Sequence, residues 1–304
     1  MSKGKLEDTS NEPLDFIFDF GANRGQNLSY YLLKAKTVVA VEANPLNCEK
    51  IEEEYKLALL QKRLFIENRI ITDQPYENGK ETSFYVHKKS DVLSMKDIPK
   101  HSLDKWKEIK GICECPSSII SKYLKGVDNQ KIFCKFDLES FDYRAINQMF
   151  NYGIYPDLLS VEMHDSKVFG AIAKTGFYKS FTIIEGPDVG TKIKGVNLAG
   201  LKERKFVNFL PHMAGPFGND ISGIWIGENS MKVLIKFLGG GWRDLHARKQ
   251  APSPIDESTI TLFCVAIIGR FTKGLRQLLH MVLPKPVTLL VRTNLNKLQS
   301  FRRS

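Results

Sequence analysis

The chain alternates short apolar runs with amphipathic stretches, a pattern that predicts strands and helices in succession. Continuous apolar runs that end in polar or acidic residues are typical of parallel strands buried on both faces. The predicted strands cover residues 16–18, 37–41, 63–69, 131–138, 156–163 and 181–185, with 222–226 as a further closing strand. Apolar residues at three- and four-residue steps predict a helix through residues 28–32 and helices over 45–60, 117–124, 143–150 and 168–175. Successive strand-helix-strand units imply an α/β, Rossmann-like sheet that is mostly parallel, with helices on both faces.

Residues 70–129 interrupt this regular alternation. Within them, residues 81–87 alternate enough to predict one strand, whereas residues 90–106 are polar and broken. Inserts in an open parallel sheet usually lie over the carboxyl ends of the strands, where ligands bind. We therefore expect this insert to select the substrate.

The residues between the first predicted strand and its helix form a glycine loop, defined as residues 19–25, DFGANRG. Gly21 and Gly25 permit positive φ and bring no Cβ toward a ligand, and the start of the next helix favours polar or anionic atoms. Glu42 ends the second strand about 20 residues further on, where a carboxylate accepts hydrogen bonds from ribose hydroxyls. A purely structural turn is the simpler interpretation, but the combination of Asp19 with Glu42 favours a ligand site.

Two kinds of ligand present an adenosine ribose to such a site: nicotinamide dinucleotides and S-adenosylmethionine (SAM). The dinucleotide fingerprint has three glycines spaced G-x-G-x-x-G, whereas this loop has two spaced G-x-x-x-G. SAM has no phosphate, and Asp19 suits the ammonium of its methionine better than a pyrophosphate. SAM is therefore the expected cofactor, and a nucleotide-linked oxidoreductase is the alternative.

Two later strands end in titratable side chains, Asp137 and Glu139 on one and Glu162 and His164 on the next. Period-two alternation predicts that each pair lies on one side of its strand. Asp137 is expected to face the cofactor, and His164 or Glu139 to be the base that an alcohol nucleophile needs. A hydrogen-bonded structural histidine is an equally open interpretation of His164. No tight ligand spacing marks a divalent ion shared by the three carboxylates, so no metal is predicted.

Motifs in a fixed order resemble those of the FkbM-type family of SAM-dependent methyltransferases. The glycine loop resembles the family's D-x-G-A-N-x-G, residues 41–45 (VEANP) its E-x-N-P turn, and residues 135–139 (KFDLE) its K-x-D-x-E strand end. Residues 161–164 (VEMH) are similar to a further family segment. The resemblance implies a class I methyltransferase fold and an O-methyltransferase that acts on a hydroxyl, commonly of a sugar or glycan. The sequence departs from the family at Ser140 and Asp142, where the family usually has glycine and often glutamate.

The candidate residues follow from these motifs and the strand ends. Cofactor binding is assigned to Asp19, Gly21, Ala22, Asn23, Gly25, Glu42, Asn44, Asn68 and Asp137. Catalysis is assigned to His164, Glu139 and Asp137, and substrate contact to Glu162 and Asp220. The expected partner is a small-molecule or glycan acceptor. Because serine tolerates positive φ less well than glycine, Ser140 keeps a catalytically silent SAM-binding protein as a second hypothesis.

The charge of the chain is concentrated in a basic C-terminal segment. The formal net charge is +10, and residues 258–304 hold eight Lys or Arg and no Asp or Glu, so +8 lies there and +2 in the rest. The low net charge of the main body therefore predicts that it does not bind nucleic acid. We divide the chain into a methyltransferase domain, residues 1–250, and a basic amphipathic extension, residues 251–304. The helical spacing of residues 260–283 suits peripheral contact with an anionic membrane, and equally suits packing on the core.

The remaining composition points to the cell interior. Five cysteines without repeated spacing predict reduced thiols, and the polar first residues lack the apolar segment of a secretory signal. The longest apolar run near the C-terminus is far short of a transmembrane helix. We expect a cytoplasmic protein, peripheral at the membrane if the extension binds there. The oligomeric state and the acceptor are left open.

Overall fold

The structure is a computed structural model of the chain. It describes residues 13–88, 90–95, 104–124, 129–164, 166–189, 193, 196–198, 205–210, 212–221, 223–238 and 242–252. Beyond Pro252, the predicted basic extension and its membrane contact lie outside the described residues. None of the described helices is long and apolar enough to cross a membrane.

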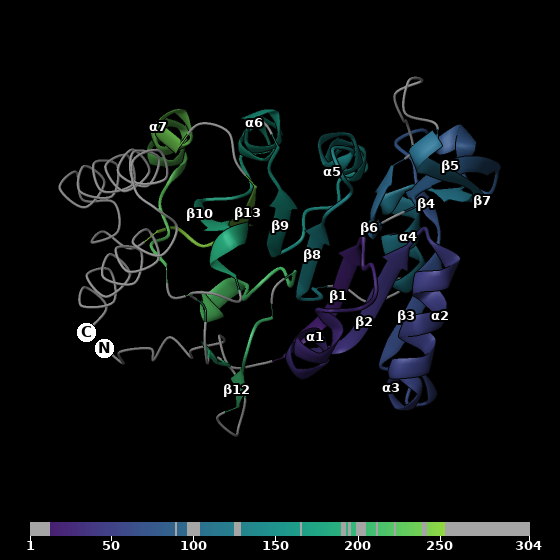
Figure 1. Cartoon of the computed structure of the whole chain (residues 1–304). Coiled ribbons are helices and arrows are strands. Elements are labelled where there is room, and N and C mark those ends of the chain that lie inside the picture. Colours follow the sequence, from purple (N-terminus) through teal and green to yellow (C-terminus); the bar gives the residue numbers. More distant parts are fainter. Residues whose placement is uncertain are drawn as a thin grey trace, which may run out of the picture.

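A seven-stranded sheet runs through the described part of the chain (Figure 1). Its strands in spatial order are β10 (Ser180–Glu185), β13 (Arg243–Arg248), β9 (Leu158–Glu162), β8 (Ile132–Phe136), β1 (Leu14–Phe20), β2 (Ala35–Glu42) and β3 (Leu64–Asn68). β13 is antiparallel to both of its neighbours, and the other adjacent pairs are parallel. The strand order reverses between β1 and β8, which makes their carboxyl ends a topological switch point. This confirms the predicted Rossmann-like, mostly parallel α/β fold.

Helices lie on both faces of the sheet, as predicted. They are α1 (Leu28–Lys34), α2 (Pro45–Glu54), α3 (Lys56–Leu60), α4 (Pro116–Tyr123), α5 (Asp142–Asn151), α6 (Ser166–Lys174) and α7 (Glu228–Leu238). Residues of α4, α5, α6 and α7 share one apolar cluster with the sheet, and residues of α1 and α2 share another. Val189, Phe209 and Phe217, which follow β10, join the α1 cluster and cover the same face. Each strand is therefore enclosed on two sides.

The alternation of side chains along β1 shows how the sheet divides the core. Phe18 and Phe20 lie in the α5-side cluster, whereas Ile17 lies in the α1-side cluster. Asp19 shares the side of Ile17 and is fully buried. β1 therefore continues through Asp19 to Phe20, two residues beyond its predicted end, because both of its faces remain covered.

The insert forms a second sheet that the sequence analysis largely missed. β4 (Ile70–Ile71), β7 (Trp106–Glu114), β5 (Glu81–His87) and β6 (Ser90–Met95) are adjacent in this order, and only β5 was predicted. Its core is a small cluster around Ile70, Phe84, Val86 and Cys113, and Cys113 is the buried residue of β7. A strand with one buried position carries no apolar run for a pattern to detect. Figure 1 shows this sheet beyond the carboxyl ends of β2 and β3, where the insert was expected.

The closing strand of the main sheet is β13, so the prediction of residues 222–226 was wrong. In that segment Ile226 makes an isolated bridge to Phe181. β13 has the sequence RDLHAR, and its alternation places Leu245 in the α5-side cluster while Asp244 and His246 are buried on the opposite face. Buried polar residues hide such a strand from a search for apolar runs.

The helix predicted over residues 45–60 is two helices, α2 and α3. They are separated at Tyr55, whose φ of −111° and ψ of 27° leave the helical region. The Tyr55 hydroxyl donates a hydrogen bond to the carbonyl oxygen of Gly25 at 3.2 Å. The residue at which the two helices separate is therefore hydrogen-bonded to the glycine loop.

Candidate functional site

The glycine loop takes the left-handed backbone that its sequence predicts. Gly21 and Gly25 have φ of 86° and 79°, and Asn23 between them has φ of 51°. A Cβ on Gly21 would lie 1.9 Å from the carbonyl oxygen of Asp137, so the loop and the end of β8 approach backbone to backbone. A Cβ on Gly25 would instead meet Leu28 at 2.9 Å, inside the core. Gly21 therefore shapes the strand ends, and Gly25 allows the packing behind them.

Glu42 joins the glycine loop to the turn after β2. Its Oε2 accepts a hydrogen bond from the backbone N–H of Asn23 at 2.7 Å, and its Oε1 accepts one from the N–H of Asn44 at 2.8 Å. Burial raises the pKa of Glu42 to about 7, although both hydrogen bonds act to lower it. Each carboxylate oxygen has a second lone pair, so the group retains acceptor capacity for a ligand.

Glu42 also lines an open cleft at the carboxyl ends of the strands, which we call the strand-end cleft. Its polar wall holds Gly21, Glu42, Arg69, Asp137 and Glu139, and Arg69 is paired with Glu114 at 2.9 Å. Its apolar wall is made by Ile70, Ile71, Phe84, Leu138 and Phe141. The cleft lies at the topological switch point, and the insert supplies part of its apolar wall through β4 and β5. It therefore combines a predicted carboxylate with an apolar slot at the expected edge of the sheet.

Six of the nine predicted cofactor residues are not among the lining residues of the cleft, and three of these six support it from behind. The Oδ1 of Asn44 caps α2 by accepting a hydrogen bond from the N–H of Leu46 at 3.1 Å. The Nδ2 of Asn68 donates to the carbonyl oxygens of Glu42 and Ala43 at 2.9 and 3.0 Å. Ala22 is buried in the α1-side core. These residues fix the two turns that border the cleft.

A buried lysine links the ends of β1 and β8. The Nζ of Lys135 lies 3.0 Å from Oδ2 of Asp137 and 3.7 Å from Oδ1 of Asp19. Burial raises the pKa of Asp19, with Lys135 opposing it, and neither carboxylate oxygen of Asp19 accepts a hydrogen bond. Burial also acts to raise the pKa of Asp137, but Lys135 holds it below its usual value. Two predicted cofactor residues thus share one buried ammonium.

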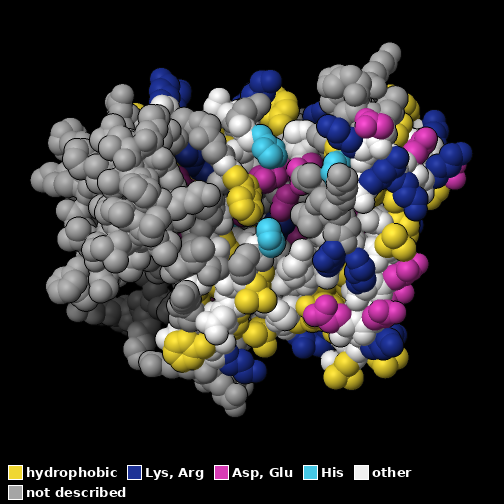
Figure 2. All heavy atoms as spheres, in the orientation of Figure 1, with side chains coloured by type: hydrophobic (Ala, Val, Ile, Leu, Met, Phe, Trp, Pro, Cys, Tyr) yellow, Lys and Arg dark blue, Asp and Glu magenta, His cyan; other side chains and the backbone are white. Residues whose placement is uncertain are grey.

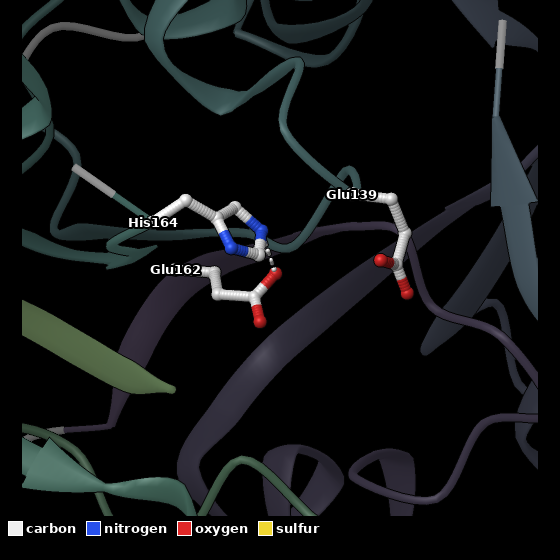
Figure 3. Close-up of side chains that lie close together, drawn as sticks. All are labelled: Glu139, Glu162 and His164. Atoms are coloured by element: carbon white, nitrogen blue, oxygen red, sulfur yellow. Dashed lines mark ion pairs between the residues drawn. The ribbon is translucent and has the colours of Figure 1, made fainter. Parts of the chain in front are cut away.

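Glu139, Glu162 and His164 meet at one point, and we call them the Glu-Glu-His cluster (Figure 3). Nε2 of His164 lies 2.9 Å from Oε2 of Glu162. One ligand atom from each of the three residues lies within 4.8 Å of the other two. Figure 2 shows acidic side chains gathered in a hollow over the ends of β8 and β9. The structure therefore brings together the two base candidates, Glu139 and His164, and the predicted substrate residue Glu162.

Glu139 reaches the cluster through a turn, so the predicted alternation along its strand was wrong. β8 ends at Phe136, and Glu139 and Ser140 have left-handed φ of 49° and 78°. Oδ1 of Asp142 closes the turn by accepting a hydrogen bond from the N–H of Leu138 at 2.8 Å. Serine thus occupies a position that favours glycine, at a cost of about 1–2 kcal/mol. The departure from the family motif adds strain but does not prevent the turn.

Crowding of the carboxylates sets the charge of the cluster. Burial, followed by the neighbouring Asp137 and Glu162, raises the pKa of Glu139 to about 7. The hydrogen bond with Glu162 raises the pKa of His164 to about 9, against the effect of burial. In the described structure the imidazole therefore carries a proton at neutral pH and pairs with Glu162.

A row of buried polar side chains crosses the sheet beside these residues, and sequence reasoning did not assign it a role. In register, Asp19 is next to Lys135, which is next to Ser160, His246 and Thr182 in turn. The Ser160 hydroxyl and Nε2 of His246 have no hydrogen-bond partner, and burial lowers the pKa of His246 to about 3. The polar alternation in RDLHAR was the signal that could have revealed part of this row.

Asp220 lies apart from the other candidates. Its Oδ2 accepts a hydrogen bond from the Tyr30 hydroxyl at 2.7 Å and pairs with Nζ of Lys34 at 3.0 Å. The nearby ring of Phe217 stacks on Phe133, near the amino end of β8, at 4.1 Å. The structure gives Asp220 partners that fix the segment after β10 on α1, and its role toward a substrate stays a prediction.

The fold is Rossmann-like, and the candidate site is a cleft at its switch point. No protein-family model matches the chain, and no curated protein matches it. Solved structures with some similarity include methyltransferase FkbM from Methylobacillus flagellatus KT, at 14% identity and a TM-score of 0.36, over 57% of this chain and 40% of that one. A SAM-dependent O-methyltransferase from Thermotoga maritima shows 10% identity and a TM-score of 0.31, over 80% of this chain and 62% of that one.

Spermidine synthase from Thermotoga maritima is a further similar structure, at 9% identity and a TM-score of 0.34, over 81% of this chain and 56% of that one. The chain thus spans less than two thirds of the length of each of these three proteins. The fold assignment rests on the strand order and register described above, and not on these likenesses.

Proposed function

We propose that the chain is a SAM-dependent methyltransferase that transfers a methyl group to a hydroxyl oxygen of a sugar or glycan acceptor. The observation that supports this most is the strand-end cleft, where the bare backbone of Gly21 and the buried carboxylate of Glu42 face an apolar wall. This combination suits an adenosine better than a phosphate-rich ligand, because a carboxylate repels phosphates and accepts hydrogen bonds from a ribose.

The residues of the cleft fit the separate parts of SAM. Ile70, Ile71 and Phe84 offer apolar surface for an adenine ring, and Glu42 offers acceptors for the ribose hydroxyls. Asp19 and Asp137 share the single ammonium of Lys135, so the two carboxylates, when both are ionised, leave one surplus negative charge near the ends of β1 and β8. That surplus charge would suit the cationic methionine group of SAM.

SAM supplies an electrophilic methyl group on a sulfonium. The acceptor oxygen forms the new C–O bond as the C–S bond breaks, its electron pair stays on sulfur, and the hydroxyl proton leaves. The chain's own contribution is to hold that oxygen in line and to promote loss of its proton. Glu139 lines the cleft, and its pKa of about 7 allows it to accept a proton near neutral pH. His164 adjoins Glu139 through Glu162 but already carries a proton there, so Glu139 is the base candidate that fits this role.

Binding and turnover experiments separate this proposal from its alternatives. Calorimetry on the full chain should show saturable binding of SAM and of S-adenosylhomocysteine and none of NAD, and NAD binding alone would support the oxidoreductase. Incubation with methyl-labelled SAM and a panel of sugar and glycan acceptors should yield a labelled methyl ether. SAM binding with no transfer to any acceptor would favour the catalytically silent protein.

The affinity for SAM should depend on pH through Glu42. The pKa of this carboxyl is about 7, and the negative charge of Asp19 is one of the influences that raise it. Glu42 in turn acts to raise the pKa of the nearby Cys48 thiol. A ribose donates its hydrogen bonds to the ionised form, so affinity should be highest well above pH 7 and should fall as the pH drops through this pKa. Calorimetric titrations with SAM over roughly three pH units, from about pH 5.5 to about pH 8.5, would measure this dependence of the affinity on pH. A profile that stays unchanged in Glu42→Gln would assign the pH dependence to another group.

A further inference from the structure

We propose that Glu139, Glu162 and His164 bind a divalent first-row transition-metal ion, for which Mn²⁺ is the probe, at the edge of the strand-end cleft. Two carboxylates and an imidazole come from two neighbouring strand ends, and Figure 3 shows the Glu139 carboxylate directed toward the Glu162 and His164 pair. Binding of the ion does not depend on the proposed function, whereas its role in methyl transfer does.

The spacing of the three side chains is close to that of a metal site. Their ligand atoms lie within 4.8 Å of one another. Two atoms bound to one ion at about 2.1 Å each are at most about 4.2 Å apart, and only when they lie on opposite sides of it, so the widest pair must close by at least about 0.6 Å. Glu139 is partly exposed on a turn, and rotation of its long side chain supplies a movement of that size. No shift of a strand is needed.

Glu162 gives a second indication of how the site would take an ion. Its side chain is only 9% exposed, and its buried Oε2 lies 2.9 Å from Nε2 of His164, so that a bound ion would take the place of the imidazole proton between them. Buried carboxylates are normally paired with hydrogen-bond donors or coordinated to metals. The half-exposed side chain of His164 leaves one side of the site open to solvent.

The surrounding charge also favours a cation. Asp137, Asp142 and Asp244 all interact electrostatically with Glu162 or its neighbours. The buried ammonium of Lys135 is already shared between Asp137 and Asp19. A divalent ion among these carboxylates would offset the surplus of negative charge.

The ligand set indicates the class of ion. Carboxylates suit Mn²⁺ and Mg²⁺, whereas imidazole suits Zn²⁺ and other later transition metals, so the mixed set favours a transition ion over Mg²⁺. Three protein ligands leave open coordination positions, as in catalytic sites. If the proposed function holds, the hydroxyl oxygen of the acceptor would take one of these positions. The bound ion would then lower the pKa of the hydroxyl, and the proton would pass to solvent water instead of to Glu139 or His164.

Titration of the metal-free full chain with Mn²⁺ tests the site without any acceptor. After removal of metals with EDTA and dialysis, electron paramagnetic resonance at pH 8 should show saturable binding of one ion per chain. Glu139→Gln and His164→Asn, both at exposed or partly exposed positions, should each weaken binding at least tenfold, since loss of even an outer partner costs about 10–100-fold. Thermal unfolding of each variant would confirm that it is folded.

Matched controls remove the same groups elsewhere. Glu53→Gln on the exposed face of α2 and His212→Asn in an exposed loop should bind Mn²⁺ like the unmodified chain. The proposal would be overturned if the unmodified chain showed no saturable binding of Mn²⁺. It would also be overturned if Glu139→Gln and His164→Asn bound Mn²⁺ as tightly as the unmodified chain. SAM binding measured in EDTA separates the two claims, because a chain that binds SAM there but never binds Mn²⁺ would lose the metal site and keep the proposed function.

Discussion

Gly21→Ala is expected to abolish measurable SAM binding. A Cβ at this position would lie 1.9 Å from the carbonyl oxygen of Asp137, and the φ of 86° is one that alanine rarely adopts. The left-handed backbone alone costs about 1–2 kcal/mol, and relief of the clash requires the loop and the end of β8 to separate. Since both line the strand-end cleft, their separation removes the cofactor site. Calorimetry with SAM, alongside thermal unfolding, would measure the effect.

Gly153→Ala is the matched control for the cost of placing alanine in a left-handed backbone. Gly153 has a φ of 74°, but a Cβ there would meet nothing within 4 Å. This variant should lose only about 1–2 kcal/mol of stability and keep its SAM affinity. Unchanged SAM affinity in Gly21→Ala, or equal losses of affinity in the two variants, would show that the close approach at Gly21 does not form the cofactor site.

Glu42→Gln should weaken SAM binding by about 10- to 100-fold, because hydrogen bonds to a charged group are worth about 1.5–3 kcal/mol. The amide also presents an NH₂ group to the N–H of Asn23 or Asn44, both of which now donate to the carboxylate. Stability should therefore fall by about 1–3 kcal/mol through the unmatched donor. Isothermal titration at pH 8 gives the affinity, and denaturant unfolding gives the stability.

Glu67→Gln separates loss of a buried carboxylate from loss of the ligand contact. Glu67 is also buried, lies one strand away on β3, and pairs with Lys122 and the Tyr123 hydroxyl rather than lining the cleft. This variant should lose stability and retain SAM affinity. A fall in affinity equal to that of Glu42→Gln would mean that the effect is general weakening of the sheet edge.

The sequence predicted those parts of the fold in which local pattern and burial agree. The glycine loop, Glu42 at the end of β2, and the parallel strands β3, β8 and β9 were found because continuous apolar runs mark strands enclosed on two faces. β13 was missed because Asp244 and His246 are buried in it although they are polar. A search for apolar runs does not find a strand of this kind, since the burial of its polar residues depends on the tertiary structure. β7 of the insert sheet was missed because it has a single buried position and therefore no apolar run.

The site was predictable as a set of residues but not as a geometry. Asp137, Glu139, Glu162 and His164 were chosen as strand-end groups, and the structure places them together. The four side chains come together because Glu139 and Ser140, after β8, both have left-handed φ. Nothing in the sequence indicated this backbone, because glycine is the usual residue there and the position holds Ser140. The coupling of Lys135 to Asp19 and Asp137 depends on strand register, which the sequence does not encode locally.

A crystal structure of the chain with S-adenosylhomocysteine tests the central claim most directly. The account predicts the adenosine in the strand-end cleft, with the ribose hydroxyls on the carboxylate of Glu42 and the adenine against Ile71 and Phe84. A cleft that stays empty at saturating ligand, or a ligand bound elsewhere on the chain, would contradict it.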